Sequence, residues 1–296
     1  MESGGDRTGG DDRVAVIAGG GQLPVQVVET LRHAGRAPFV IAIEGEADPA
    51  LLQFEHETIY PVHVGRLMSI LDRVKPSAVV MIGAVKGRPS ILRAIPDWPT
   101  LRVAARMLPK LRSGDDTLLR SVVDMIEEAG YPVRGVHEFL PDLLARKGNI
   151  AGPKPSKRDL DAVMTAANGA VTLGALDAGQ ACVAVGRRIV ALEGAEGTDL
   201  MLERVAELRK LGRLPAGRGG VLVKLAKPNQ EIRVDLPTIG ISTVEKAAAA
   251  GLRGIAVHAG HALIADHESA CGAAKQLDVF ILGIDPEDSE YAGERP

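Results

Sequence analysis

The stretch KPNQEIRVDLPTIG (227–240) concentrates side chains that could act on a phosphate group. Glu231, Arg233 and Asp235 fall on every second position, with an apolar residue after each. This alternation predicts a strand with one apolar face and one charged face. Arginine neutralises phosphate oxygens, and aspartate can hold Mg²⁺ or orient a water for attack on phosphorus. A solvated face of a strand would show the same pattern, so both interpretations stay open.

Two lysines precede this row. Lys224 lies within the apolar run VLVKLAK, which predicts another strand, and Lys227 stands at its end. Lysine is a compact cation that suits phosphate. Together the lysines, Arg233 and Asp235 compose a plausible phosphoryl or pyrophosphoryl site.

A second acidic segment, EGTD (196–199), ends a predicted strand and opens a predicted helix. Thr198 is placed to cap that helix, and the free N–H groups at a helix start suit a phosphate. Glu196 and Asp199 carry oxygen donors of the kind that Mg²⁺ uses. Capping alone would also explain Thr198 and Asp199.

The glycine-rich segment AGGGQLP (18–24) stands between a predicted strand and a predicted helix. Glycines let the backbone N–H groups of such a turn approach a phosphate closely. The dinucleotide fingerprint needs a further glycine where Pro24 stands, so the match is incomplete. A mononucleotide or phosphate site is therefore favoured over an NAD site, and a tight turn without a ligand remains the alternative.

Two further segments could reach the same ligand. GAVKGRP (83–89) follows another buried strand, and its Lys86 could meet phosphate at the crevice of an open α/β sheet. SGDDTLLR (113–120) places Asp115 and Asp116 at a helix start. Capping and the helix dipole explain acids there, although the second acid leaves room for a ligand contact.

Apolar runs that alternate with helical segments must position these residues. RVAVIA (13–18), PFVIAIEGE (38–46) and AVVMIGAV (78–85) predict buried strands, and helical patterns separate them. This rhythm implies parallel pairing with helices on both faces. Further along, EIRVDL predicts a strand, and Ser242 with Glu245 predicts a capping box at the next helix.

The boundaries follow from composition. We expect a Rossmann-like N-terminal domain over 13–140 and a distinct mixed α/β domain over 159–286. The segment 141–158 mixes Pro, Gly and Lys without a clear period, which predicts a linker. Residues 1–12 lack the apolar core of a signal peptide and predict a disordered tail.

Bulk composition excludes several classes of protein. A net charge of −3 gives no general attraction to nucleic acid, and 3% aromatic residues argue against base-stacking platforms. No apolar run approaches the ~20 residues of a spanning helix, so we expect a soluble protein. Cys182 and Cys271 show no metal or redox spacing, which fits a reducing cytoplasm. Neither G-x-S-x-G nor the P-loop pattern occurs.

Five segments, in their order and spacing, resemble one family: VIAGGGQLP (16–24), SGDDTLLR (113–120), LDAGQACV (176–183), EGTDLMLERV (196–205) and KPNQEIRVDLPTIG (227–240). The chain is similar to the UDP-2,3-diacylglucosamine pyrophosphatases of the LpxI type. The resemblance runs from about residue 13 to about residue 286 and leaves out residues 1–12.

The resemblance implies a Rossmann-like domain, a C-terminal catalytic domain and a domain-swapped homodimer that holds a lipid nucleotide between its domains. The family cleaves UDP-2,3-diacylglucosamine with Mg²⁺ into UMP and 2,3-diacylglucosamine 1-phosphate, an intermediate on the way to lipid A. Water attacks the α-phosphate, and the aspartate of the Arg-x-Asp-Leu-Pro segment, here Asp235, is important for that step. A cytoplasmic location follows, with peripheral contact with the inner membrane surface left open.

We therefore expect Asp235 to be catalytic, and Asp235, Glu196 and Asp199 to be the metal ligands. We expect the substrate to be bound by Gly20, Gly21, Gln22, Leu23, Lys86, Asp116, Gln180, Gly197, Thr198, Lys224, Lys227, Gln230, Arg233 and Thr238. One alternative is a regulator that binds a nucleotide sugar or lipid in the same cleft without hydrolysis. Another is an NAD-dependent oxidoreductase, which GGGQLP suggests and its missing glycine disfavours.

Overall fold

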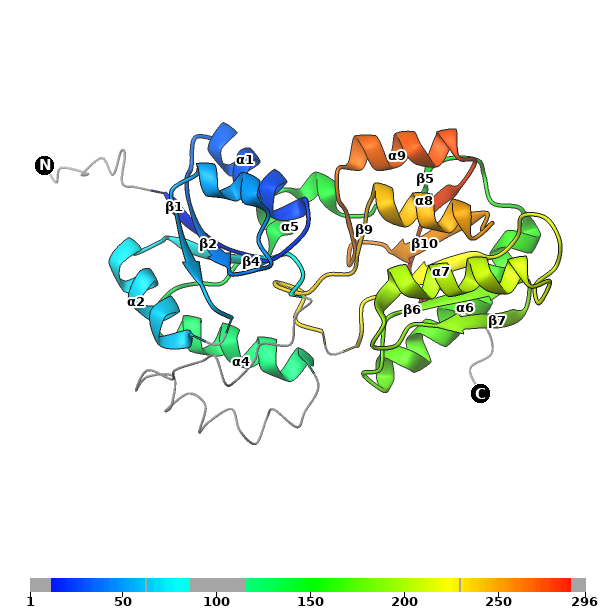
Figure 1. Cartoon of the computed structure of the whole chain (residues 1–296), viewed down its shortest axis with the longest axis horizontal. Coiled ribbons are helices and arrows are strands. Elements are labelled where there is room, and N and C mark those ends of the chain that lie inside the picture. Colours follow the sequence, from blue (N-terminus) through cyan, green and yellow to red (C-terminus); the bar gives the residue numbers. More distant parts are fainter. Residues whose placement is uncertain (1–11, 62, 86–114, 229, 289–296) are drawn as a thin grey trace, which may run out of the picture. The chain divides into compact units, whose positions relative to one another are not determined.

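The computed structural model describes residues 12–61, 63–85, 115–228 and 230–288 (Figure 1). The chain divides between Leu140 and Pro141 into two compact units. Each unit is α/β, with helices packed on a sheet that contains parallel strands, which confirms the predicted fold class.

The first unit is built on a four-stranded parallel sheet in the order β3-β2-β1-β4. Its strands are β1 (Arg13–Ala18), β2 (Ala37–Ile43), β3 (His56–Ile59) and β4 (Ala78–Ile82). The central strand β1 reads as an unbroken apolar run because both of its faces are covered. Beyond β4, an isolated parallel bridge joins Val79 to Val133.

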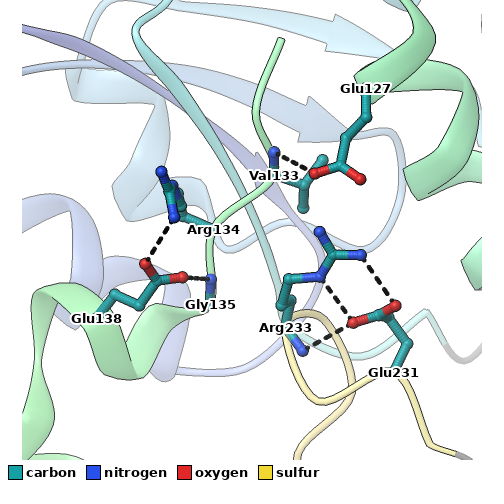
Figure 2. Close-up of polar contacts among 7 residues, drawn as sticks. All are labelled: Glu127, Val133, Arg134, Gly135, Glu138, Glu231 and Arg233. Carbon is teal, nitrogen blue, oxygen red and sulfur yellow. Dashed lines mark hydrogen bonds and ion pairs between the residues drawn. The ribbon is translucent and has the colours of Figure 1, made fainter.

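The helical segments of this unit are α1 (Leu23–His33), η1 (Pro49–Gln53), α2 (Val64–Val74), α4 (Asp115–Glu128) and α5 (Val136–Phe139). Pro24 lies in the first turn of α1, where a missing N–H breaks no helical hydrogen bond. In Figure 1, α1 lies on one side of the sheet and α2 on the other. Figure 2 shows how α5 begins: the Gly135 N–H donates to Glu138 Oε1 at 2.8 Å, and Arg134 donates to the other carboxylate oxygen.

The second unit contains a six-stranded mixed sheet in the order β5-β12-β10-β8-β6-β7. Its strands are β5 (Gly148–Ala151), β6 (Ala181–Val185), β7 (Arg188–Leu192), β8 (Val221–Lys224), β10 (Gly254–His258) and β12 (Phe280–Ile284). The three central strands β8, β10 and β12 run parallel, and β5, β6 and β7 pair antiparallel with their neighbours. A separate two-stranded sheet joins β9 (Thr238–Ile239) and β11 (Leu263–Ile264).

Helices cover both faces of the six-stranded sheet (Figure 1). They are α6 (Lys157–Ala175), α7 (Gly197–Lys210), α8 (Ile241–Ala249) and α9 (His267–Gln276), and a short turn η4 (Pro141–Leu143) precedes β5. The alanine-rich face of α6 packs against one core, which includes Phe280 and Cys182. The other core lies under α7, α8 and α9 and includes Leu222 and Ile255.

Part of the segment 141–158, which we expected to be a linker, is regular structure. Strand β5 pairs with β12 at the edge of the second unit's sheet. The prediction missed this strand because four residues are too short to show a period. Helix α6 begins at Lys157 because Ser156 and Asp159 exchange the two hydrogen bonds of a capping box.

The predicted strand EIRVDL does not form. The N–H groups of Val234 and Asp235 both donate to the Glu231 carbonyl, at 3.1 and 3.0 Å, so the segment turns like a helix. Alternation over six residues could not decide this, because a strand also needs a neighbour to pair with. The segment becomes extended only at β9.

The predicted capping box of Ser242 and Glu245 is also wrong. Helix α8 begins at Ile241, two residues earlier than a cap at Ser242 predicts, and the N–H of its cap residue Gly240 donates to Thr243 Oγ1 at 3.4 Å. In the part of the chain that the structure describes, no helix is both long enough and apolar enough to cross a membrane.

Candidate functional site

The glycine-rich loop after β1 packs directly on the residues that follow β4. Gly20 and Ala84 exchange two backbone hydrogen bonds, of 2.7 and 3.0 Å. A Cβ on Gly19 would lie 2.7 Å from the Ala84 carbonyl oxygen, so only glycine allows this approach. The structure therefore brings the loop that carries Gly20, Gly21 and Gln22 to the same sheet edge as the start of the GAVKGRP segment.

The predicted ligand-binding residues of this loop differ in exposure. Gly21 is exposed and has a φ of 99°, and the Gln22 amide donates to Asp48 Oδ2 at 3.1 Å. The Leu23 side chain is only 8% exposed and belongs to the core, so a ligand could meet only its backbone. Lys86 lies outside the described residues, and the backbone of Asp116 lies in the first turn of α4.

Most of the remaining predicted residues gather at one edge of the six-stranded sheet. Strands β7 and β8 both end there, helix α7 starts there, and the loop from β8 to β9 leaves from it. Lys224 is the last residue of β8 and pairs with Ala181 of β6. Glu193, which follows β7, donates its N–H to the Ala181 carbonyl at 2.9 Å. Glu193, Ala181 and Lys224 thus form one row across three neighbouring strands.

The side chain of Lys224 lies on the face covered by α7, α8 and α9. The strand alternates, so Val221 and Val223 enter the core under α6 whereas Leu222 and Lys224 face the opposite way. The Lys224 ammonium donates to the Thr238 carbonyl at 3.2 Å. Burial lowers the pKa of Lys224, and the charges of Glu193 first, then Asp235 and Asp199, oppose that shift.

Glu193 was missed by the sequence analysis. Glu193 is 8% exposed, and its carboxylate accepts hydrogen bonds from the Thr198 hydroxyl and from the Gln180 N–H, the latter at 2.9 Å. Thr198 therefore does not cap α7, whose first flanking residue is Glu196. The sequence did offer one signal for Glu193: an acidic residue stands directly after an apolar strand and directly before a glycine. Acidic residues are rarely buried unless they are paired.

The side chain of the catalytic candidate Asp235 is held by Gln230, which lies five positions earlier in the chain. The Gln230 amide donates to Asp235 Oδ2 at 2.6 Å, and its own oxygen accepts the Lys227 N–H at 2.9 Å. Gln230 is only 7% exposed, so a buried side chain of the loop holds the loop in shape through these two hydrogen bonds. The Lys227 ammonium lies 2.8 Å from Asp177 Oδ1, which directs this cation toward the end of α6.

Arg233 makes a local ion pair. Its Nε and one terminal nitrogen contact the two carboxylate oxygens of Glu231 at 2.8 and 3.0 Å, as Figure 2 shows. The guanidinium fork thus faces a carboxylate two residues away. Sequence alternation placed Glu231 and Arg233 in the charged row of a strand, and the turn instead brings the two side chains together.

The proposed metal ligands are not assembled into one cluster. Glu196 pairs with Arg204 at 2.8 Å, and Asp199 pairs with Lys246 at 3.0 Å. Among the described residues, no group of three or more His, Cys, Asp or Glu side chains is arranged to hold a metal. Asp235 is therefore the one of the three acids without an ion pair in the described part of the chain.

Three predicted residues frame this edge. Gly197 opens α7 with a φ of 78°, and Thr238 supplies the carbonyl that accepts from Lys224. Gln180 lies between β6 and the loop after β8, because its carbonyl accepts the Leu225 N–H at 3.0 Å. The Gln180 side-chain oxygen is buried with no hydrogen-bond partner among the described residues. A buried polar atom of that kind calls for a partner, which a ligand or a water can supply.

Two protein-family profiles together match almost the whole chain. The profile of the LpxI N-terminal domain matches residues 13–143, and that of the LpxI C-terminal domain matches residues 146–282. The chain belongs to the LpxI family. This LpxI family member is 38% identical over 277 residues to a Caulobacter vibrioides protein named UDP-2,3-diacylglucosamine pyrophosphatase LpxI, a match that covers 93% of this chain and 99% of that protein.

Solved structures add no argument about function. The biotin carboxylase subunit of pyruvate carboxylase is 14% identical, with 71% of this chain and 43% of that chain covered and a TM-score of 0.25. The biotin carboxylase domain of Hydrogenobacter thermophilus 2-oxoglutarate carboxylase is 10% identical, with coverages of 68% and 42% and a TM-score of 0.25. Scores this low support no conclusion about fold or activity.

Proposed function

We propose that this protein hydrolyses the pyrophosphate of UDP-2,3-diacylglucosamine, giving UMP and 2,3-diacylglucosamine 1-phosphate, as a step toward lipid A. Family membership and the near full-length likeness to a pyrophosphatase of that name support the substrate. The single structural observation that carries the proposal is that Lys224, at the end of β8, and Asp235, in the loop from β8 to β9, belong to the same sheet edge, where the Lys224 ammonium donates to the Thr238 carbonyl three residues after Asp235. Water attack on a phosphate uses a cation to offset the phosphate charge and a carboxylate to orient the water.

The chain's own residues would act as follows. Asp235, fixed by Gln230, orients the attacking water or holds a metal beside the α-phosphate. Lys224 offsets the charge that develops on the phosphate oxygens. One of its three N–H groups is bound to Thr238, and within the described residues the other two have no protein partner.

The acidic residues present fit Mg²⁺ that arrives with the substrate better than a resident ion. Protein sites often hold Mg²⁺ by one or two carboxylates plus substrate phosphates. Asp235 supplies one such carboxylate, whereas Glu196 and Asp199 are paired with Arg204 and Lys246. When bound, the ion would polarise the phosphate oxygens and offset their charge.

Isotope labelling tests the reaction and the site of attack. Hydrolysis in H₂¹⁸O places the label in UMP if water attacks the α-phosphate, and in 2,3-diacylglucosamine 1-phosphate if it attacks the other phosphorus. Replacing Asp235→Ala should abolish most UMP release, and near-normal turnover would remove Asp235 from the chemistry. Saturable binding of substrate without any UMP release would instead favour the regulator.

The metal and the assembly need separate measurements. We expect EDTA to stop turnover and added Mg²⁺ to restore it, whereas calorimetry without substrate should show weak binding of Mg²⁺. A homodimer with exchanged domains is part of the proposal on the strength of the family resemblance, and light scattering of the purified protein tests its mass. Sedimentation with anionic vesicles tests peripheral membrane contact.

A further inference from the structure

Glu193 combines burial, charge and hydrogen bonding in a way that ordinary loop acids do not. It is one of the few buried acidic side chains of the described chain, with 8% of its surface exposed. A buried carboxylate is costly unless hydrogen bonds or an opposite charge compensate for lost water. Both kinds of compensation are present here, and both belong to residues of the proposed site.

The hydrogen bonds tie two separate elements to one carboxylate. One oxygen accepts from the Thr198 hydroxyl in the first turn of α7, and the other accepts from the Gln180 N–H just before β6. Because the Thr198 hydroxyl donates to Glu193, it is not free to donate to a phosphate. The carboxylate thus sets the position of the helix start.

The sheet register brings the same carboxylate toward Lys224. Glu193 and Lys224 flank Ala181 in one row, and directly opposed residues of antiparallel strands share a face. Two strand spacings separate them by about 10 Å at the backbone. The small alanine leaves space between their longer side chains. Glu193 is the strongest of the three acidic influences on Lys224, ahead of Asp235 in the β8–β9 loop and Asp199 on α7.

We propose that Glu193 is a positioning residue of the hydrolytic site, which fixes the start of α7 through Thr198 and keeps Lys224 charged and oriented toward the substrate phosphates. This inference rests on the proposed function. No covalent step involves Glu193. Lys246 of α8 is paired with Asp199 and Glu203, and Arg204 of α7 is paired with Glu196 and donates to the Leu192 carbonyl beside Glu193.

The decisive variant is Glu193→Gln, which keeps the shape and removes the charge. The negative charge of Glu193 opposes the effect of burial on the pKa of Lys224, so its removal lowers that pKa further. Lys224 then loses its proton at a lower pH, and the alkaline limb of the kcat profile should move toward lower pH. At neutral pH kcat should fall roughly 10- to 100-fold, with a smaller change in KM. Glu207→Gln, an exposed acid of α7, is the matched control.

A second pair of variants separates charge from structure. Lys224→Arg carries a permanent charge, so the alkaline limb should be absent with either Glu or Gln at position 193. Thr198→Val leaves the carboxylate but removes its hydroxyl donor, so kcat should fall while the alkaline limb stays in place. This variant carries the test if Glu193→Gln does not fold.

Lysine NMR distinguishes failure of the inference from failure of the proposed function. The Lys224 titration is followed in substrate-free wild-type protein and in Glu193→Gln, with ¹³C-labelled lysine. A lower midpoint in the variant supports the inference even if the wild type releases no UMP. Identical midpoints, or superimposable pH profiles of kcat, would overturn it.

Discussion

The Gln230 amide donates a 2.6 Å hydrogen bond to the Asp235 carboxylate, five positions further along the chain. This bond fixes the carboxylate that the proposed reaction needs. Gln230→Ala should therefore lower kcat on the order of 10-fold, the usual effect of losing a supporting hydrogen bond, with little change in KM. Steady-state assays of UMP release measure both constants. The exposed Gln276→Ala is the control, and an unchanged kcat in Gln230→Ala would show that Asp235 needs no such support.

Because His258 is largely buried, we expect the free energy of unfolding to fall in mild acid. Burial, helped by His261, lowers its pKa from 6.5 to about 4, although Asp285 acts in the opposite direction. Above pH 6.5 the histidine is neutral in both folded and unfolded chains and contributes nothing to the pH dependence. Between pH 6.5 and 4 the unfolded chain takes up a proton that the folded chain does not, so stability falls as the pH falls.

Urea unfolding at pH 7.5 and pH 5 measures this effect. His258→Gln should lose less stability than the wild type over that interval. His33→Gln, an exposed histidine at the end of α1, should behave like the wild type. Equal losses in the wild type and His258→Gln would assign the acid sensitivity to other groups.

The two cysteines should differ from an ordinary exposed thiol in their reactivity. Cys182 is fully buried between the sheet and α6, and burial raises its pKa to about 12. Because the thiolate is the reactive form, iodoacetamide at pH 8 should leave Cys182 unmodified in the native protein. Mass spectrometry after digestion reads the modification at each site. In urea both thiols should react, and fast native labelling of Cys182 would contradict its burial.

Two glycines of the second unit should respond oppositely to alanine. A Cβ on Gly272 of α9 would meet no atom within 4 Å, and alanine favours a helix, so Gly272→Ala should stabilise by ~0.5–1 kcal/mol. A Cβ on Gly283 of β12 would overlap the Arg146 carbonyl, so Gly283→Ala should destabilise by about 1–3 kcal/mol. Urea midpoints rank the two variants against the wild type, and equal midpoints would contradict both expectations.

Apolar runs predicted the central strands of both units because a strand covered on both faces needs an unbroken apolar sequence. β1 and β8 are of this kind, and the polar residues after them could be placed at a sheet edge from the sequence. The same reasoning was wrong for EIRVDL, because this segment pairs with no other strand among the residues that the structure describes. Instead, backbone hydrogen bonds from Val234 and Asp235 to the Glu231 carbonyl fold the segment into a turn, which brings the Glu231 and Arg233 side chains together.

Glu193 shows why a site is harder to predict than a fold. Its role depends on strands β6, β7 and β8 lying side by side, and that order is set by long-range pairing rather than by local sequence. Lys224 and Asp235 could be singled out because their residue types suit phosphate chemistry. A buried acid between them and α7 became visible only through its contacts with Thr198 and Gln180.

The backbone of the loop after β1 packs directly on the backbone of the residues after β4, so neither segment can change shape alone. Gly19 and Gly83 lie back to back, and a Cβ on either would press on the other loop's backbone. A change in one loop therefore demands a matching change in the other. Anyone who transplants the GGGQLP loop into a related scaffold will need to carry residues 83–85 with it.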